Sequence, residues 1–426
     1  MSEEADKIVT LRGIFQRITN YVIKKGEEIK IKLQQRRQLN DPEILKLFLE
    51  EQQVKSLNKQ IEAVKERMKE NSAKHEETIE KYETILRSLK TEYNVLVTKY
   101  KEITKNVQVM SRVRPRTADE IIRTKPLGDI KITDYEIKIK AEDTIKYNKF
   151  TFNKIFTPEA SQEEVFKELS FLVQLALEGY INVCVFAYGQ AGSGKTYTME
   201  GKYDSEGMLP RTVRYILDRK KELKLSGWDY RVEASFLEIY NERIIDLLNL
   251  NFQPNNKKHK IRIFDSSDQD AYVSNLQIKK IQSPEEFNEY LRIARRNLIT
   301  SSKSHLVARI RLIGTHSVKQ EVLVGNLNFV DLAGSIKIKA EDKLTKVEMT
   351  EAININKSLA SLSNVILALL KKQKHIPYKN SKLTHLLMPT LRRDSKILMV
   401  LNISPLCESY NETLKSLKFV SNAINC

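Results

Sequence analysis

The amino-acid sequence predicts an α/β domain with a central β-sheet flanked by helices, preceded by an N-terminal α-helical coiled coil. Strand-like and helix-like stretches alternate over residues 106–426, and a glycine-rich phosphate-binding sequence directly follows an apolar, strand-like run. The first 105 residues, by contrast, contain one proline and two glycines among many Lys, Glu, Gln, Leu and Ile residues. The composition therefore divides the chain near residue 106.

The N-terminal part predicts a coiled-coil stalk over residues 40–105. Asn40, Asp41 and Pro42 form a helix start, because a short polar side chain can cap the first turn and proline is tolerated where no N–H is needed. Apolar residues then recur at alternating steps of three and four, the spacing of a left-handed coiled coil, with one four-residue stutter. The two series are Leu57, Ile61, Val64 and Met68, then Ile79, Tyr82, Leu86, Leu89, Tyr93, Leu96, Tyr100 and Ile103. A single long amphipathic helix packed on its own domain is the alternative for residues 40–105. The sequence of residues 1–39 indicates no function for that segment.

Apolar runs predict strands in the C-terminal part, and three-to-four spacing predicts helices. The expected strands are 107–113, 181–187, 231–239, 261–264, 306–313, 321–330 and 397–403. The expected helices are 161–177, 284–298, 347–372 and 381–390. This alternation is typical of an α/β domain, which binds ligands at the carboxyl ends of its strands.

A phosphate-binding loop follows the strand expected at 181–187. It has the pattern G-x-x-x-x-G-K-T and comprises Gly189, Gln190, Ala191, Gly192, Ser193, Gly194, Lys195 and Thr196. Its glycines allow consecutive N–H groups to face a β-phosphate, while the lysine adds a full charge and the threonine hydroxyl can ligate Mg²⁺. A glycine turn in an unrelated strand–helix unit is the alternative. The flanking strand and helix favour a site for a nucleoside triphosphate.

The formal net charge of +17 indicates a polyanionic partner: nucleic acid, an anionic membrane or an acidic protein surface. A generally lysine-rich proteome would give the same charge. No aromatic residues alternate with the basic ones as a base-stacking platform, which disfavours nucleic acid. The three cysteines have neither metal-ligand spacing nor pairing logic, as expected in a reducing compartment, and no signal peptide, membrane span or lipidation motif is visible.

Seven ordered motifs across residues 106–426 resemble those of kinesin motor domains. They are Arg-Val-Arg-Pro at 112–115, the phosphate loop, Ser-Phe-Leu-Glu-Ile-Tyr-Asn-Glu at 235–242, Ser-Ser-Lys-Ser-His at 301–305, Asp-Leu-Ala-Gly-Ser at 331–335, Ile-Asn-Lys-Ser-Leu at 355–359 and His-Ile-Pro-Tyr-Lys-Asn-Ser-Lys-Leu-Thr at 375–384. A coiled coil on the N-terminal side, with the motor at the C-terminus, resembles kinesin-14. The resemblance implies a P-loop NTPase-type motor domain with an eight-stranded mixed sheet, and movement toward microtubule minus ends.

The resemblance also implies roles for individual residues. Arg112, Pro115 and Tyr197 would contact adenine; Ser302 and Ser304 would form the first switch, with Ser304 and Thr196 on Mg²⁺; Asp331 would hold a Mg²⁺-bound water; and Gly334 would donate its N–H to the γ-phosphate. Such a γ-phosphate contact distinguishes ATP from ADP. ATP and Mg²⁺ are therefore the expected ligands.

Two departures from the kinesin pattern bear on hydrolysis. Kinesins have Arg where this chain has Lys303 and Glu where it has Ile336, and in the family those two residues form the salt bridge that closes the switches. Isoleucine accepts no proton, and lysine lacks the planar fork of arginine. Losing a proton-transfer group costs about 10²–10⁴ in rate, so nucleotide binding should survive while fast hydrolysis is in doubt. An asparagine of the family is also replaced, by Leu298, and Glu341 or Asp342 could instead pair with the lysine.

Basic residues cluster around the motif at 375–384, which in kinesins touches the acidic surface of tubulin. They are Lys371, Lys372, Lys374, Lys379, Lys382, Arg392 and Arg393. Charges of this kind steer association and make it sensitive to salt, although each lysine run taken alone could be a solvated loop.

The sequence therefore predicts an ATP-dependent, microtubule-stimulated motor that forms a coiled-coil homo- or heterodimer on cytoplasmic or spindle microtubules, with no nucleic acid or membrane partner. A hydrolysis-impaired tether, or the passive subunit of a heterodimer, is the alternative. A scaffold with a vestigial pocket is disfavoured by the intact phosphate loop.

Overall fold

The computed structural model describes residues 55–63, 107–123, 126–141, 145–179, 182–249, 260–263, 271–300, 303–336, 345–392 and 395–424. The chain divides into two compact units, residues 1–105 and 106–426. In the first unit, residues 55–63 are helical and bury Ile61. The rest of the coiled coil expected over 40–105 lies outside the described residues, so it stays a prediction.

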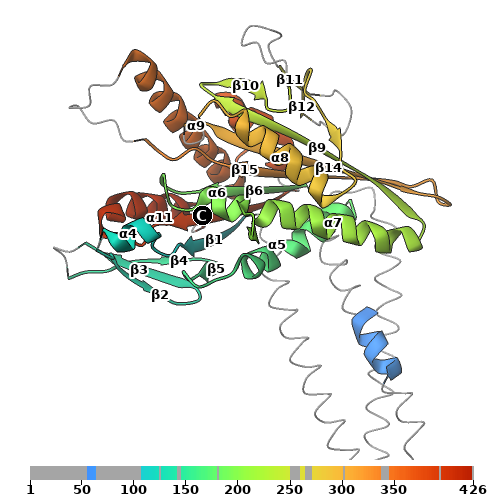
Figure 1. The fold of residues 1–426 in the computed structure, drawn as a ribbon, viewed down its shortest axis with the longest axis horizontal. Helices are drawn as coiled ribbons and strands as arrows, with labels where there is room; N and C mark the ends of the chain where they lie inside the picture. The colour runs from blue at the N-terminus through green and yellow to red at the C-terminus, as the bar shows by residue number, and fades with distance from the viewer. Residues whose placement is uncertain are drawn as a thin grey trace, which may run out of the picture. The chain divides into compact units, whose positions relative to one another are not determined.

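The second unit is built on a mixed nine-stranded sheet (Figure 1). The strands follow the order β10-β9-β14-β15-β6-β16-β1-β5, and the short β13 pairs with β9 at the side of this path. β6 runs parallel to both of its neighbours, whereas β14 is antiparallel to both of its own, β9 and β15. The bounds are β1 Val107–Val113, β5 Lys154–Phe156, β6 Val183–Tyr188, β9 Trp228–Tyr240, β10 Arg243–Asp246, β13 Lys279–Lys280, β14 His305–His316, β15 Val322–Asp331 and β16 Lys396–Ile403.

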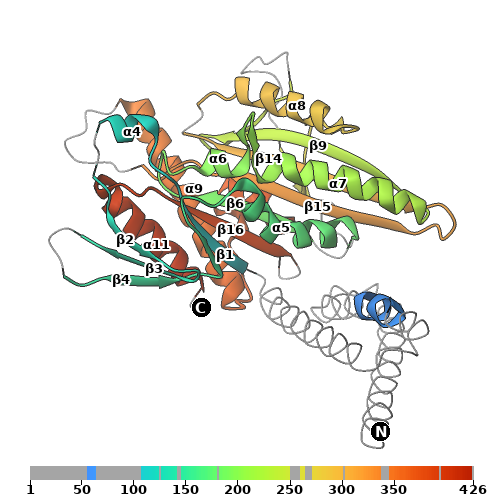
Figure 2. The ribbon, with the colours of Figure 1, turned by 60° about the horizontal axis from the view of Figure 1, so that its bottom comes forward.

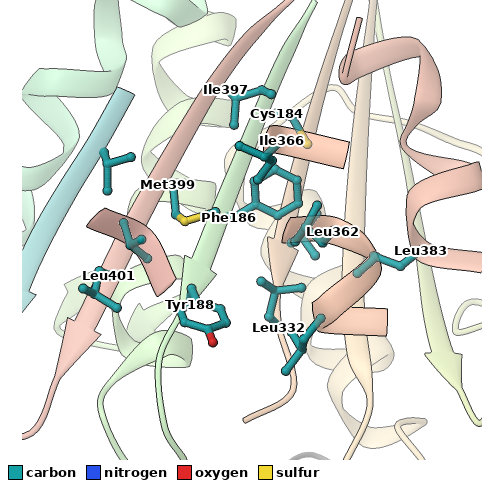
Figure 3. Close-up of a cluster of buried hydrophobic side chains, with 14 of the residues drawn as sticks. Cys184, Phe186, Tyr188, Leu332, Leu362, Ile366, Leu383, Ile397, Met399 and Leu401 are labelled. Atoms are coloured by element: carbon teal, nitrogen blue, oxygen red, sulfur yellow. The ribbon is translucent and has the colours of Figure 1, made fainter. Parts of the chain in front are cut away.

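Helices cover both faces of the sheet, and side-chain alternation along each strand supplies a core to each face. On β6, Val183 and Val185 pack with α5, α7 and α8, while Cys184 and Phe186 pack with α9, α10 and α11. Figure 3 shows Phe186 of the second core near Leu362 and Ile366 of α9. These helices are α5 Gln162–Leu177, α7 Met208–Leu225, α8 Pro284–Arg296, α9 Lys346–Leu370, α10 Lys382–Leu386 and α11 Tyr410–Ile424.

Two of the long helices, α5 and α9, begin at capping boxes that the sequence provides. Ser161 and Glu164 form a capping box before α5, and Thr345 and Glu348 form one before α9. Among the described helices, α9 alone has the length and mean hydropathy to cross a membrane. Its apolar residues pack on the sheet, however, as in a core helix.

Smaller elements complete the unit. A three-stranded antiparallel sheet, β2-β3-β4, packs beside α11 (Figure 2). The bounds are α4 Ala118–Ile122, β2 Asp129–Ile132, β3 Glu136–Lys140, β4 Asn148–Thr151, α6 Lys195–Met199, β7 Gly201–Lys202, β8 Ser205–Glu206, β11 Ile261–Ile263, β12 Ala271–Val273, η1 Tyr378–Asn380, η2 Met388–Thr390 and η3 Cys407–Ser409.

The mixed sheet flanked by helices confirms the expected fold class, and the structure also corrects several elements. The helix expected at 381–390 is split, because Pro389 lacks the N–H that would continue α10, and the chain forms the 3₁₀ turn η2 instead. Strand β14 extends to His316, beyond the expected end at 313. Helix α7 and the β2–β4 sheet were not predicted. The sheet has the eight implied strands along its main path and β13 as a ninth.

Candidate nucleotide-binding site

The glycine-rich loop joins the carboxyl end of β6 to α6 and curls as the motif predicts. Gly189 has a φ of +146°, and a Cβ there would lie 2.3 Å from the carbonyl oxygen of Asn402, so only glycine fits. Gly194 caps α6 in the left-handed conformation at a φ of +96°. Inside the loop, Ser193 Oγ donates to the Gln190 carbonyl at 2.8 Å. The backbone thus forms a narrow turn with Ala191 and Gly192 exposed at its tip.

Lys195 is buried against this loop. Its Nζ donates to the carbonyl oxygens of Gly189 at 3.0 Å and Gln190 at 2.8 Å. Burial lowers the pKa of Lys195, and the Asp331 carboxylate partly offsets this. A phosphate group could take the place of these two carbonyls, because an anionic oxygen is a stronger acceptor for an ammonium group.

Thr196 and Asp331, which the sequence separates widely, lie in contact. The Thr196 hydroxyl donates to Asp331 Oδ2 at 2.6 Å, and the same oxygen accepts a bond from Arg295 at 2.9 Å. Arg295 Nε also donates to Glu200 at 2.6 Å. Burial raises the pKa of Glu200, while Arg295 acts in the opposite direction. Arg295 and Glu200 were missed from the sequence, where Arg295 looks like an ordinary cation in the last turn of a helix.

The donors at this point fit a magnesium ion bound together with a nucleotide. A hydroxyl and a carboxylate are the oxygen ligands that Mg²⁺ prefers. In the described part of the chain, no group of three or more His, Cys, Asp or Glu side chains could hold a metal alone. Phosphate oxygens and water would therefore have to complete the coordination.

Arg112, which is expected in the adenine shelf, is buried. The residue is 6% exposed, and its guanidinium donates to Gln162 at 2.6 Å and Thr198 at 3.1 Å. It also lies 5.2 Å from the ring centre of Tyr197. Arg112 is thus bonded inward beside Tyr197. The expected contacts of Arg112, of the exposed Pro115 and of the half-buried Tyr197 with adenine stay predictions.

Arg114, for which the sequence indicated no role, lies on the phosphate loop. Its Nε donates to the Gly192 carbonyl at 2.7 Å, and its two terminal nitrogens bind the Glu120 carboxylate at 2.7 and 2.6 Å. These bonds from Arg114 lower the pKa of Glu120 to about 2. Glu120 thus holds Arg114 against the loop.

The two expected switch segments lie beside the loop and are joined by His305. A Cβ on Gly334 would lie 2.9 Å from the Ala191 nitrogen, so the Asp-Leu-Ala-Gly segment touches the phosphate loop directly. His305 Nδ1 accepts the Ala333 N–H at 3.0 Å, and its Nε2 lies 2.7 Å from Ser358 Oγ. The ring is therefore protonated on Nε2, and burial lowers its pKa to about 4.

The serines of the first switch are described only in part. The Ser304 hydroxyl donates to the Thr300 carbonyl at 2.7 Å. Ser302 lies outside the described residues, so its expected contact with the γ-phosphate stays a prediction.

Lys303 has a carboxylate partner that the sequence did not indicate. Its Nζ lies 3.0 Å from Oε2 of Glu351 in α9, and the Tyr240 hydroxyl donates to the other oxygen of that carboxylate. Glu341 and Asp342, the partners considered from sequence, lie outside the described residues. The pair found thus joins the first switch to α9.

Ile336 offers no polar side chain, but its backbone is held. Its N–H donates to Asn356 Oδ1 at 3.2 Å, and its carbonyl accepts from Asn356 Nδ2 at 2.8 Å. The side chain packs against the core that α9 covers. Leu298 packs against the core on the opposite face of the sheet. Ile336 therefore fixes the second switch to α9 through its backbone.

The predicted basic cluster surrounds the C-terminal end of α9. Lys371, Lys372 and Lys374 are exposed where the helix ends, and α9, η1 and α10 pack together. Lys379 of η1 and Lys382 of α10 are exposed as well, and Arg392 is half-buried. Arg393 lies outside the described residues. The other six thus surround one group of packed elements.

A model of the kinesin motor domain matches residues 112–426. The protein claret segregational of Drosophila melanogaster is 43% identical over 337 residues, covering 76% of this chain and 47% of that protein. Carboxy-terminal kinesin 2 of Xenopus laevis is 41% identical over 76% of this chain and 54% of its own length. The chain thus spans about half the length of these curated relatives.

Solved structures give the same result. The motor domain of the Kar3-like kinesin from Ashbya gossypii is 38% identical, with a TM-score of 0.66 over 75% of this chain and 100% of that one. The C-terminal motor and motor homology domain of Kar3Vik1, fused to a synthetic heterodimeric coiled coil, is 35% identical, with a TM-score of 0.69 over 87% of this chain and 98% of that one.

Proposed function

The chain belongs to the kinesin family, and we propose that it is an ATP-dependent microtubule motor of the C-terminal-motor type, directed toward minus ends. Kinesin motor domains are in general microtubule-stimulated ATPases. The observation that carries the proposal is the contact set around the phosphate loop: Thr196 meets Asp331, and Gly334 meets Ala191. Both switches are in turn bonded to α9.

The residues of this chain suggest how binding proceeds. The loop N–H groups and Lys195 bind the phosphates of ATP, while Thr196 and Asp331 hold the magnesium ion, which neutralises phosphate charge. Gly334 is placed to donate its N–H to the γ-phosphate. A change in its position reaches α9 through the Ile336–Asn356 and His305–Ser358 bonds. Nucleotide state thereby alters α9.

The exposed face of α9 supports an acidic partner. Lys346, Thr350, Ile353 and Lys357 are exposed at three-to-four spacing, and the three lysines at 371, 372 and 374 extend this face. The two acidic residues of the helix are engaged elsewhere, Glu348 in the capping box and Glu351 in the pair with Lys303. A positive face of this kind suits the acidic surface of tubulin, and we place the protein on the microtubule cytoskeleton.

A second candidate function rests on Ile336. No carboxylate at this position can take a proton from the attacking water, and loss of a proton-transfer group costs about 10²–10⁴ in rate. The chain could then serve as a nucleotide-binding tether, or as the passive member of a coiled-coil heterodimer. One similar structure is that of the motor and motor homology domain of Kar3Vik1, which is fused to a synthetic heterodimeric coiled coil.

Steady-state ATPase assays with and without microtubules, together with microtubule gliding, separate the two functions. If the protein is a motor, microtubules should stimulate its ATP turnover. Microtubules should also glide over surface-bound protein with their minus ends trailing. Tight nucleotide and microtubule binding without stimulated turnover or gliding would establish the tether. Absence of nucleotide binding would contradict both.

A further inference from the structure

We propose that Glu351 is the positioning residue that couples the nucleotide site to α9, acting as an electrostatic latch on Lys303. This inference rests on the proposed microtubule function. Lys303 precedes Ser304, and its Nζ lies 3.0 Å from the Glu351 carboxylate. In the part of the chain that the structure describes, Glu351 is the acid with which Lys303 forms an ion pair.

The two partners are held unequally, because Glu351 is buried and Lys303 is more exposed. The Glu351 side chain is 7% exposed, and its second oxygen accepts a hydrogen bond from Tyr240 at the end of β9 in the central sheet. The Lys303 side chain is 37% exposed and lies in a loop. The hydrogen bond from Tyr240, followed by that from Lys303, lowers the pKa of Glu351, so the carboxylate is ionised at neutral pH.

Glu351 also differs from the other links between α9 and the switches. Asn356 binds the Ile336 backbone and Ser358 binds His305, and both of these links are made by neutral groups. The bond from Lys303 to Glu351 is charge-assisted and therefore stronger than the two neutral links. Its loss would weaken the connection between the first switch and α9 most.

The latch lies beneath the face of α9 that we assign to the microtubule. Val347 and Ile353, which flank Glu351 in sequence, are 63% and 52% exposed, whereas Glu351 itself is buried. A partner pressing on this face would displace Glu351 against Tyr240 and Lys303. Release of Lys303 would in turn free the segment that carries Ser304.

The test compares microtubule affinity in two nucleotide states, which requires no hydrolysis. The intact chain and its Glu351→Gln variant are co-sedimented with microtubules in ADP and in a non-hydrolysable ATP analogue. Glutamine keeps the size and the bond to Tyr240 but removes the charge. We expect the factor by which the microtubule dissociation constants in ADP and in the ATP analogue differ (their ratio) to fall roughly tenfold in the variant. This is within the range typical of coupling between sites. Affinity for a fluorescent nucleotide should stay within about twofold, because Lys195 and its loop are unchanged.

Two further variants make the result specific. Glu348→Gln removes the same charge one turn away and can keep the capping box, so it should retain the parent's ratio. Exchanging the charges, Lys303→Glu with Glu351→Lys, should recover most of the ratio lost in the single variant.

The latch is contradicted if Glu351→Gln keeps the parent's ratio, or if its loss matches that of Glu348→Gln. Failure of the exchange to recover any coupling, in a variant that melts at the parent's temperature, would also contradict it. A parent whose microtubule affinity is the same in both nucleotides would overturn the proposed function itself, and the latch with it.

Discussion

The phosphate loop and the junction between the switches and α9 are built in different ways. The shape of the loop is set by its backbone conformation. Gly189 and Gly194 adopt conformations suited to glycine, and Lys195 bonds to carbonyls five and six residues away. At the junction, side chains from distant segments meet, as Lys303 does with Glu351. The loop is therefore specified by eight consecutive residues, whereas the junction depends on how the whole sheet and α9 pack.

This difference explains which parts could be predicted. The motif at 189–196 predicted the phosphate loop correctly, and apolar spacing predicted α5 and α9 with starts within one residue of those observed. Asp331 was placed beside Thr196 only through the resemblance to kinesins. No local signal could identify Glu351 or Arg295, because each of them acts on a partner 36 or more residues away.

The resemblance also implied a role for Arg112 that stays a prediction. Arg112 occupies a motif position that implied contact with adenine, yet its guanidinium is tied inward to Gln162 and Thr198. Burial depends on the neighbours that α5 and α6 supply, which a motif does not encode. The motif thus indicates the region of the site, whereas the burial of Arg112 is seen only in the structure.

The largest expected effect tests nucleotide binding by the phosphate loop. Lys195→Ala should weaken ATP binding by roughly 10²–10⁴-fold, because two or more charge-assisted hydrogen bonds to phosphate are lost. Titration with a fluorescent ATP analogue measures this. Lys202→Ala, an exposed lysine in β7, is the matched control and should bind as the parent does. Equal affinity in both variants would refute the loop assignment.

The next effect concerns the buried charges beneath the loop. Arg295→Ala leaves Glu200 and Asp331, whose side chains are 11% and 8% exposed, without their cation. Breaking such a pair lowers the free energy of unfolding by about 3–5 kcal/mol. Denaturant titration should show this loss, whereas Arg292→Ala, on the exposed side of α8, should leave the midpoint nearly unchanged. Similar midpoints for the two variants would mean that the carboxylates find other partners.

His305 should make the junction sensitive to acid. Its pKa is about 4 in the fold and 6.5 in the unfolded chain, so the unfolded state binds a proton first as the pH falls. The contribution of His305 to the free energy of unfolding is complete above pH 6.5 and is lost progressively as the pH falls to 4. The loss is up to about 3 kcal/mol, at 1.36 kcal/mol for each pKa unit. His305→Asn should remove this part of the pH dependence. Parallel stability–pH curves for parent and variant would show that His305 does not titrate as expected.

The smallest effect tests the partner surface. Charge reversal at Lys371, Lys372 and Lys374 should weaken microtubule co-sedimentation about three- to tenfold at low salt and flatten its salt dependence. Affinity for nucleotide should stay normal, since these residues lie on the far end of α9 from the capping box. Unchanged microtubule affinity and salt dependence would mean that microtubules contact another surface of the protein.

The central claim is that this chain retains a complete nucleotide-binding loop but lacks the carboxylate at position 336 that speeds hydrolysis. The most direct test is the microtubule-stimulated ATPase rate of the parent beside that of the Ile336→Glu, Lys303→Arg double variant. The account predicts slow turnover in the parent and an increase of up to about a hundredfold in the variant, because a carboxylate and its bidentate partner are restored together. A parent that already turns over rapidly, with a double variant no faster, would contradict it.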